Sequence, residues 1–173
     1  MHLHAKDTQE TSQNMSIPSK IDPRGQRFAA ALTSVVLAIV LLTAPSPVAV
    51  ALLAVQAVLF ALGAFAGPQS SPYGLLFKTV VRPRIGAPKE LEDSAPPRFA
   101  QAVGLAFAVV ALAGYLSGAT LLGAIATGFA LGAAFLNAAF GFCLGCEIYL
   151  LVRRIAPGNT ITKETNRAGH PVA

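Results

Sequence analysis

Long apolar stretches, separated by short groups of Pro, Gly, Ser and charged residues, dominate the chain. Four of them reach about the 20 residues that a helix needs to cross the hydrocarbon core of a bilayer. The first two open on Asp22-Pro23 and Ser46-Pro47, which combine a capping side chain with Pro in the first helical turn. We therefore predict four transmembrane helices, at about residues 23–43, 48–66, 98–116 and 119–140, the last of them extending to 152.

Polar residues concentrate in three further segments. Residues 1–21 and 156–173 are rich in polar side chains and are predicted to be disordered tails. Between the second and third spans a short helix is expected at about residues 72–82, ended by Pro83. Its apolar residues alternate with Lys, Thr and Arg, so we expect it to lie in the membrane interface.

The beginnings of the first and third spans resemble each other. Pro23-Arg24 with Arg27-Phe28 is echoed by Pro96-Pro97-Arg98-Phe99, and each precedes a helical hairpin. Chance similarity is the alternative, because membrane-entry sequences share these residue types. The predicted fold is all-α: an integral membrane four-helix bundle over residues 22–155, built from two similar hairpins with an interfacial helix in the central loop.

Composition supports a membrane protein, since apolar residues make up 54% of the chain and charged residues only 12%, against about 25% charged in soluble domains. The basic residues flank the spans instead of forming a face for nucleic acid, which we exclude as a partner. The two short turns, 44–47 and 117–118, contain no Lys or Arg. The positive-inside rule therefore predicts an inner-membrane protein with both termini in the cytoplasm. The basic residues expected at the membrane surface are Lys78, Arg82, Arg84, Lys89, Arg98, Arg153 and Arg154.

Glycine pairs spaced by four residues suggest close helix packing, because they let helix backbones approach each other in lipid. They are Gly63/Gly67, Gly114/Gly118, Gly128/Gly132 and Gly141/Gly145. We expect a tight bundle, and a homo-oligomer or a larger membrane complex is a candidate assembly.

Candidate chemistry is concentrated in Cys143, Cys146 and Glu147, which include both cysteines of the chain. At spacings of three and four residues on one helix, the three side chains project from the same side, and the sulfurs are near enough for a reversible disulfide. Against this, the pair is expected late in the fourth helix, where the helix dipole disfavours a thiolate. The alternative is that both cysteines are small packing residues.

Glu147 is an ionisable residue at the edge of an apolar stretch, which suggests function, with Arg153 or Arg154 as its partner. Measured back from Arg153 it lies about 9 Å inside the membrane, whereas counted forward from Ala119 it has reached the interface and is an ordinary surface residue. Asn137, about three turns earlier, faces another side of the helix and is expected to form an interhelical hydrogen bond.

Two other kinds of site do not fit the cysteine pair. A c-type haem needs His directly after the second cysteine, where this chain has Glu147. A zinc site with four cysteines needs a second pair, which only another subunit would supply. We expect neither a metal nor a cofactor.

These pieces together resemble a bacterial family of four-span integral membrane proteins of unknown function, common in actinobacteria. The resemblance covers about residues 20–154, and its most specific part is the run from Gly141 to Tyr149, Gly-Phe-Cys-Leu-Gly-Cys-Glu-Ile-Tyr. The other matching pieces are Asp22-Pro23-Arg24 with Arg27-Phe28, Leu76-Phe77-Lys78 through Val81-Arg82-Pro83-Arg84, Pro97-Arg98-Phe99 and Leu136-Asn137. Members of the family are found with thioredoxin-like or sulfurtransferase proteins, so the resemblance implies, by association, thiol or sulfur chemistry and a partner of that kind.

The leading hypothesis is an uncharacterised protein of the lipid bilayer that handles thiols or sulfur species at Cys143, Cys146 and Glu147, near the cytoplasmic face. One cysteine would act as nucleophile and the other as resolving thiol, with Glu147 moving the proton. Two alternatives stay open: a non-enzymatic packing or assembly subunit of a membrane complex, and a small conduit for a sulfur-containing solute. The residues favour no particular reaction, so an enzyme is not assumed; if the protein is one, its activity is thiol–disulfide exchange or sulfur transfer.

Overall fold

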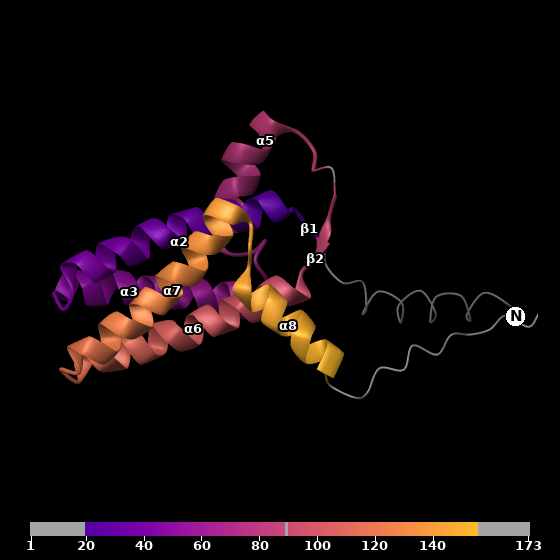
Figure 1. The fold of residues 1–173 in the computed structure, drawn as a ribbon. Coiled ribbons are helices and arrows are strands. Elements are labelled where there is room, and N and C mark those ends of the chain that lie inside the picture. The colour runs from indigo at the N-terminus through magenta and orange to yellow at the C-terminus, as the bar shows by residue number, and fades with distance from the viewer. Residues whose placement is uncertain (1–19, 89, 156–173) are drawn as a thin grey trace, which may run out of the picture.

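The computed structural model describes residues 20–88 and 90–155, and four long helices that run side by side make up most of this part of the chain (Figure 1). They are α2 (Pro23–Thr43), α3 (Pro47–Phe65), α6 (Ala95–Leu116) and α7 (Thr120–Phe140). Each is long and apolar enough to cross a membrane. The predicted fold class is therefore confirmed, and the chain is a multi-pass membrane protein. Residues 1–19 of the tail predicted at 1–21, the tail predicted at 156–173, and Lys89 lie outside the described residues.

Side chains at the helix starts determine where these helices begin. The Arg24 N–H donates to Asp22 Oδ1 at 3.0 Å, and Ser46 caps α3 in the same way, as predicted. α6 begins three residues earlier than expected, because the Ala95 N–H donates to Asp93 Oδ1 at 2.9 Å. Two prolines then occupy its first turn. The N–H groups of a first turn have no partner within the helix, so proline, which lacks an N–H, loses no hydrogen bond there.

The two hairpins pack across each other, with α2 against α7 and α3 against α6. Apolar side chains fill the centre, and Leu37 and Leu53 are fully buried there. Gln56 is a buried polar exception: its Nε2 donates to Thr33 Oγ1 at 3.4 Å, and its Oε1 accepts a hydrogen bond from the Tyr73 hydroxyl at 3.1 Å. Because its amide is hydrogen-bonded at both ends, Gln56 is accommodated in an apolar core.

An approximate two-fold relation links the hairpins, as the sequence repeat predicts. The strands that precede them, β1 (Lys20–Ile21) and β2 (Glu92–Asp93), pair antiparallel. Arg27 of α2 donates to two carbonyl oxygens at the end of α7, at 3.4 and 3.3 Å. Arg98 of α6 donates to two carbonyl oxygens at the end of α3, at 3.0 and 2.6 Å. Each arginine thus satisfies the last carbonyls of the helix on which its own helix packs. The strand pairing also shortens the predicted N-terminal tail, because residues 20–21 are ordered against the central loop.

The central segment is helical for longer than predicted. It comprises α4 (Pro72–Leu76), the π-helical turn η1 (Phe77–Val81) and α5 (Arg82–Ile85), and the run ends at Gly86, with φ of 73°. The prediction that Pro83 ends the helix is wrong. The wider π turn ends just before Arg82, so that Pro83 falls in the first turn of α5, where its missing N–H costs no hydrogen bond.

The fourth apolar stretch, predicted to cross the membrane at about residues 119–140 and to extend to 152, forms two helices. α7 ends at Phe140, and a separate helix, α8 (Leu144–Ile155), leaves the bundle at an angle (Figure 1). Gly141 between them has φ of 70°, a left-handed conformation that glycine adopts without steric cost.

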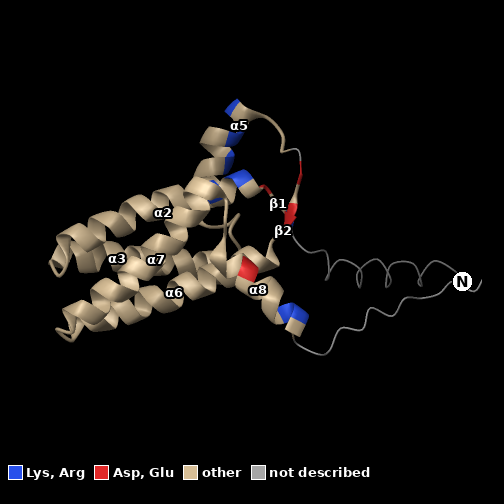
Figure 2. Ribbon diagram, in the orientation of Figure 1, with Lys and Arg blue, Asp and Glu red and all other residues tan. Residues whose placement is uncertain are grey.

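Charged residues gather at one end of the bundle, where α5, the two strands and α8 lie, and the opposite turns carry none (Figure 2). We call this the charged end. The predicted glycine pairs provide close packing in part, since a Cβ added at Gly63, Gly114 or Gly145 would lie 2.6 to 2.9 Å from an atom of a neighbouring helix. Gly67, Gly118 and Gly141 all have positive φ and belong to turns, so three of the four predicted packing pairs include a turn residue.

Candidate functional site

Cys143 lies at the start of α8, where it holds the N-cap position. The Glu147 N–H donates to the Cys143 carbonyl at 3.1 Å, which is the first hydrogen bond of that helix. A residue whose carbonyl accepts this bond sits at the positive end of the helix dipole, beside N–H groups that have no partner within the helix.

The expected position of the cysteines late in a helix is therefore corrected, and with it the electrostatic argument against a thiolate. Helix N-termini are where proteins lower the pKa of a cysteine. The sequence misled because residues 119–152 are almost uniformly apolar, and only Gly141 indicates the break. The two cysteines are unbridged and half-buried.

Hydrogen bonds lower the pKa of Cys143 from 9.0 to about 7. The thiol of Cys146 contributes most, and the N–H groups of Cys146 and Gly145 add to it, while burial and the charge of Glu147 oppose the shift. The same bond raises the pKa of Cys146 well above its usual range, assisted by burial and by the charge of Cys143. The thiolate therefore forms at Cys143 in preference to Cys146, which keeps its proton.

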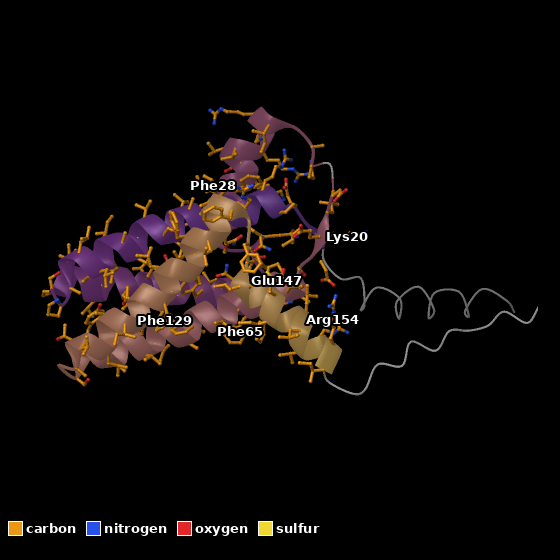
Figure 3. The ribbon with its side chains drawn as sticks, viewed as in Figure 1. Lys20, Phe28, Phe65, Phe129, Glu147 and Arg154 are labelled. Carbon is orange, nitrogen blue, oxygen red and sulfur yellow. The ribbon has the colours of Figure 1, made fainter. Side chains whose placement is uncertain are left out.

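Glu147 is exposed in the first turn of α8, where a carboxylate is favourable to the helix dipole. Figure 3 shows it near the start of the helix and Arg154 at the far end. Within the described residues Glu147 forms no ion pair, so the expected partnership with Arg153 or Arg154 is not seen. Arg153 instead lies over the Tyr149 ring, 5.9 Å from its centroid.

α8 is held against α6 by a close contact at Gly145. A Cβ added there would lie 2.6 Å from the Ala100 Cβ, so only glycine allows this approach. One turn further along, the Phe99 and Tyr149 rings pack with centroids 5.7 Å apart. Together these contacts fix the start of α8, and hence Cys143, relative to the bundle.

A cavity of about 270 Å³, which we call the thiol cavity, lies beside Cys143. All four long helices and the start of α8 contribute to its wall, which is mainly apolar. Its polar lining residues are Gln26, Thr33, Gln101 and Asn137. Asn137 therefore shares a site with Cys143, contrary to the prediction that it faces another side. Its side chain forms no hydrogen bond with any described residue, so the predicted interhelical bond is not seen either.

A second cavity, of about 230 Å³, lies at the charged end between β1, α2 and the central segment, and we call it the basic cavity. Lys20, Lys78 and Arg82 line it. Gln26 and Gln101 line both cavities, so the two adjoin. The sequence analysis did not single out these two glutamines; the available signal was a glutamine near the start of the first span and of the third span.

Among the described residues, no three His, Cys, Asp or Glu side chains come together. The arrangement instead combines an acidified thiol, a protonated second thiol and an apolar cavity. This is chemistry suited to sulfur nucleophiles at the end of a membrane bundle.

The class that fold and site define is a polytopic α-helical membrane protein with a dithiol at a helix N-terminus. The chain belongs to the family described as a domain of unknown function, DUF4395, whose model matches residues 21–154. No curated protein and no solved structure matches it.

Proposed function

We propose that the protein is a membrane thiol–disulfide oxidoreductase in which Cys143 is the nucleophile and Cys146 the resolving thiol. The observation that carries this proposal is the position of Cys143 at the N-cap of α8, with its pKa lowered to about 7. A thiol is most effective in exchange when its pKa lies near the ambient pH, because enough of it is ionised while it remains a good nucleophile.

The exchange would proceed in two steps. The Cys143 thiolate attacks one sulfur of a substrate disulfide, the substrate S–S bond breaks, and the first substrate thiolate leaves. Cys146 then loses its proton and attacks Cys143, which releases the second substrate thiol and leaves a Cys143–Cys146 disulfide. We assign removal of the Cys146 proton to Glu147, which adjoins it in sequence, is exposed to solvent, and exerts its charge on both sulfurs.

We further propose that the charged end faces the cytoplasm of an inner-membrane protein and that a thioredoxin-like or sulfurtransferase protein docks there. The basic residues of this end support both points, since positively charged loops stay inside and basic surfaces attract anionic partners and lipids. A membrane-impermeant thiol reagent should label Cys143 in inverted vesicles and not in intact cells, and the reverse pattern would contradict this orientation.

The direct test of the proposed reaction uses purified protein in detergent, with reduced and oxidised thioredoxin as the probe. The wild-type dithiol should convert to an intramolecular disulfide and back, followed by mass spectrometry after alkylation. If no Cys143–Cys146 disulfide forms under oxidising conditions, the proposal is wrong.

Growth of a deletion strain separates this reaction from the two alternatives. Under thiol or sulfur stress, the double variant Cys143→Ala/Cys146→Ala should fail to restore growth. Full restoration would favour the packing or assembly role. Cysteine-dependent uptake of labelled thiosulfate into proteoliposomes, without disulfide exchange, would favour the conduit.

A further inference from the structure

An apolar groove on the outer face of α7 runs into the thiol cavity. Its lining consists of Ile125, Gly128, Phe129, Gly132, Ala133, Leu136 and Leu144. Three of these residues, Phe129, Ala133 and Leu144, also line the thiol cavity, so the groove and the cavity are continuous. We call it the α7 groove. Because α7 is a membrane-spanning helix, a hydrocarbon chain lying in this groove would remain in the lipid phase.

Two glycines keep the α7 groove open. A Cβ added at Gly128 or at Gly132 would meet no atom within 4 Å, so neither glycine is explained by close packing inside the chain. Phe129 lies between them with 64% of its surface exposed (Figure 3), and its ring stacks on Phe107 with centroids 6.1 Å apart. The groove therefore has an aromatic wall where it meets the cavity.

The interior of the thiol cavity selects for a neutral ligand with hydrogen-bond acceptors. No Lys, Arg, Asp or Glu is among its lining residues. The side-chain amides of Gln26, Gln101 and Asn137 border it, and none of them hydrogen-bonds to any residue that the structure describes. An apolar cavity of about 150 Å³ holds a benzene ring, so the volume of about 270 Å³ accommodates a substituted six-membered ring.

We propose that the thiol cavity and the α7 groove together bind a membrane quinone, which oxidises the Cys143–Cys146 dithiol. The ring would occupy the cavity, with its carbonyl oxygens accepting hydrogen bonds from the bordering amides, and the isoprenoid chain would lie in the groove. This inference rests on the proposed function with the exchange running in the reverse direction, in which the Cys143–Cys146 disulfide is reduced by a partner dithiol and the regenerated dithiol then needs a two-electron acceptor.

The reaction balances with the quinone as the only oxidant. Two S–H bonds break, one S–S bond forms between Cys143 and Cys146, and the two sulfurs lose two electrons. The quinone gains these two electrons, and each of its oxygens gains a proton, which yields the hydroquinone. A reduced thioredoxin-like partner would then restore the dithiol by exchange.

The test uses the full-length protein in lipid nanodiscs, reduced and freed of reductant, with a decyl-substituted benzoquinone or naphthoquinone as the probe. Wild type should produce one hydroquinone for every two thiols that it loses. Gly128→Leu/Gly132→Leu places side chains in the groove, where a Cβ at either position would meet no atom within 4 Å, and Gln101→Leu removes one amide. Each should slow the reaction by at least about tenfold, which corresponds to about 1.4 kcal/mol. Ala54→Leu, a small-to-large change at an exposed position of α3 that lines none of these cavities, is the matched control and should react like wild type.

Three outcomes would overturn the quinone site. The groove variant could react as fast as the control, hydroquinone could fail to form, or the groove variant could instead change the oligomeric state, which would assign the groove to a second copy of the chain. Exchange with thioredoxin separates this result from the proposed function. If exchange persists without quinone reduction, only the quinone site is wrong, and if exchange is absent too, both proposals are wrong.

Discussion

Ser71 and Cys143 hold the same position in the two halves of the molecule, yet only one of them is suited to chemistry. Each is the N-cap of the helix that follows the second span of its hairpin. Ser71 Oγ accepts a hydrogen bond from the Gly74 N–H at 3.2 Å and donates to the Pro68 carbonyl at 2.8 Å. The hydroxyl thus performs a structural role, whereas the pKa of the thiol in the other half is lowered, mainly by the Cys146 thiol and additionally by the N–H groups of Cys146 and Gly145.

The third residue of each helix explains why the dithiol occurs only in the second half. Gly74 corresponds to Cys146, and a Cβ at Gly74 would lie 2.2 Å from the Pro68 carbonyl oxygen. The link from α3 to α4 folds over this position, while the shorter link from α7 to α8 leaves it clear. A helix with such an N-cap residue therefore supports either a rigid turn or a resolving cysteine, depending on the segment that connects it to the preceding span.

The largest expected effect distinguishes the two cysteines from each other. Cys143→Ser should reduce disulfide exchange on the order of a thousandfold or more, because it removes the nucleophile. Cys146→Ser should leave the first attack intact and accumulate a mixed disulfide at Cys143, detectable on a non-reducing gel with a thioredoxin probe. Ser71→Ala is the control in the other half and should exchange normally. Equal trapping by both serine variants would contradict the assigned roles.

Moving the cysteine motif into the first half should damage the fold. Gly74→Cys introduces a side chain against the Pro68 backbone and should cost about 3 kcal/mol of stability. The reciprocal change, Cys146→Gly, should cost only about 0.5–1 kcal/mol, since it weakens a helix turn without a clash. Unfolding in detergent, followed by circular dichroism, measures both. Similar losses of stability in the two variants would mean that Gly74 is not sterically restricted in the way its contact with Pro68 indicates.

The close contact between α8 and α6 should hold Cys143 in place. Gly145→Ala puts a methyl group against Ala100 and should cost about 1–3 kcal/mol. Because the clash would distort the first turn of α8, it should weaken the hydrogen bonds that Cys143 receives from the Cys146 thiol and from the N–H groups of Cys146 and Gly145, so the pKa of Cys143 should also rise towards its ordinary value. Thiol titration of the variant checks this, and Gly132→Ala, where space is open, is the matched control. An unchanged pKa of Cys143 in Gly145→Ala would show that the added methyl group does not disturb the start of α8.

The smallest expected effect concerns the two arginines of the repeat. Arg27→Ala and Arg98→Ala each remove hydrogen bonds to the last carbonyls of a partner helix. Each should lower stability by roughly 0.3–1 kcal/mol. Thermal unfolding should give nearly equal shifts for the two variants. A loss confined to one variant would argue against the two-fold relation of the hairpins.

Much of the fold was predictable from sequence because membrane spans depend on local composition. Apolar length and cap residues such as Asp22 and Ser46 identified the four spans, and the repeat around Arg27 and Arg98 identified the two hairpins. The helix break at Gly141 was missed because one glycine in an apolar helix is ordinarily tolerated, and its φ of 70° depends on tertiary contacts.

The candidate site was only partly predictable for the same reason. The sequence identified Cys143 and Cys146 as a pair, but their electrostatics depend on which of them caps a helix. The cavity joins residues that are far apart in the chain, such as Gln26, Gln101 and Asn137. No spacing rule in a single sequence connects such positions.

The most direct test of the account is the pH dependence of alkylation of the reduced wild-type protein by iodoacetamide, followed for each cysteine by mass spectrometry. The rate at Cys143 should rise as pH increases and reach half its maximum near pH 7, because only the thiolate reacts and the pKa is lowered to about 7. Cys146 should remain unmodified over the same range, since its pKa is raised. If both cysteines titrate together at the ordinary value of 9.0, Cys143 is not a reactive helix cap, and the proposed chemistry fails with it.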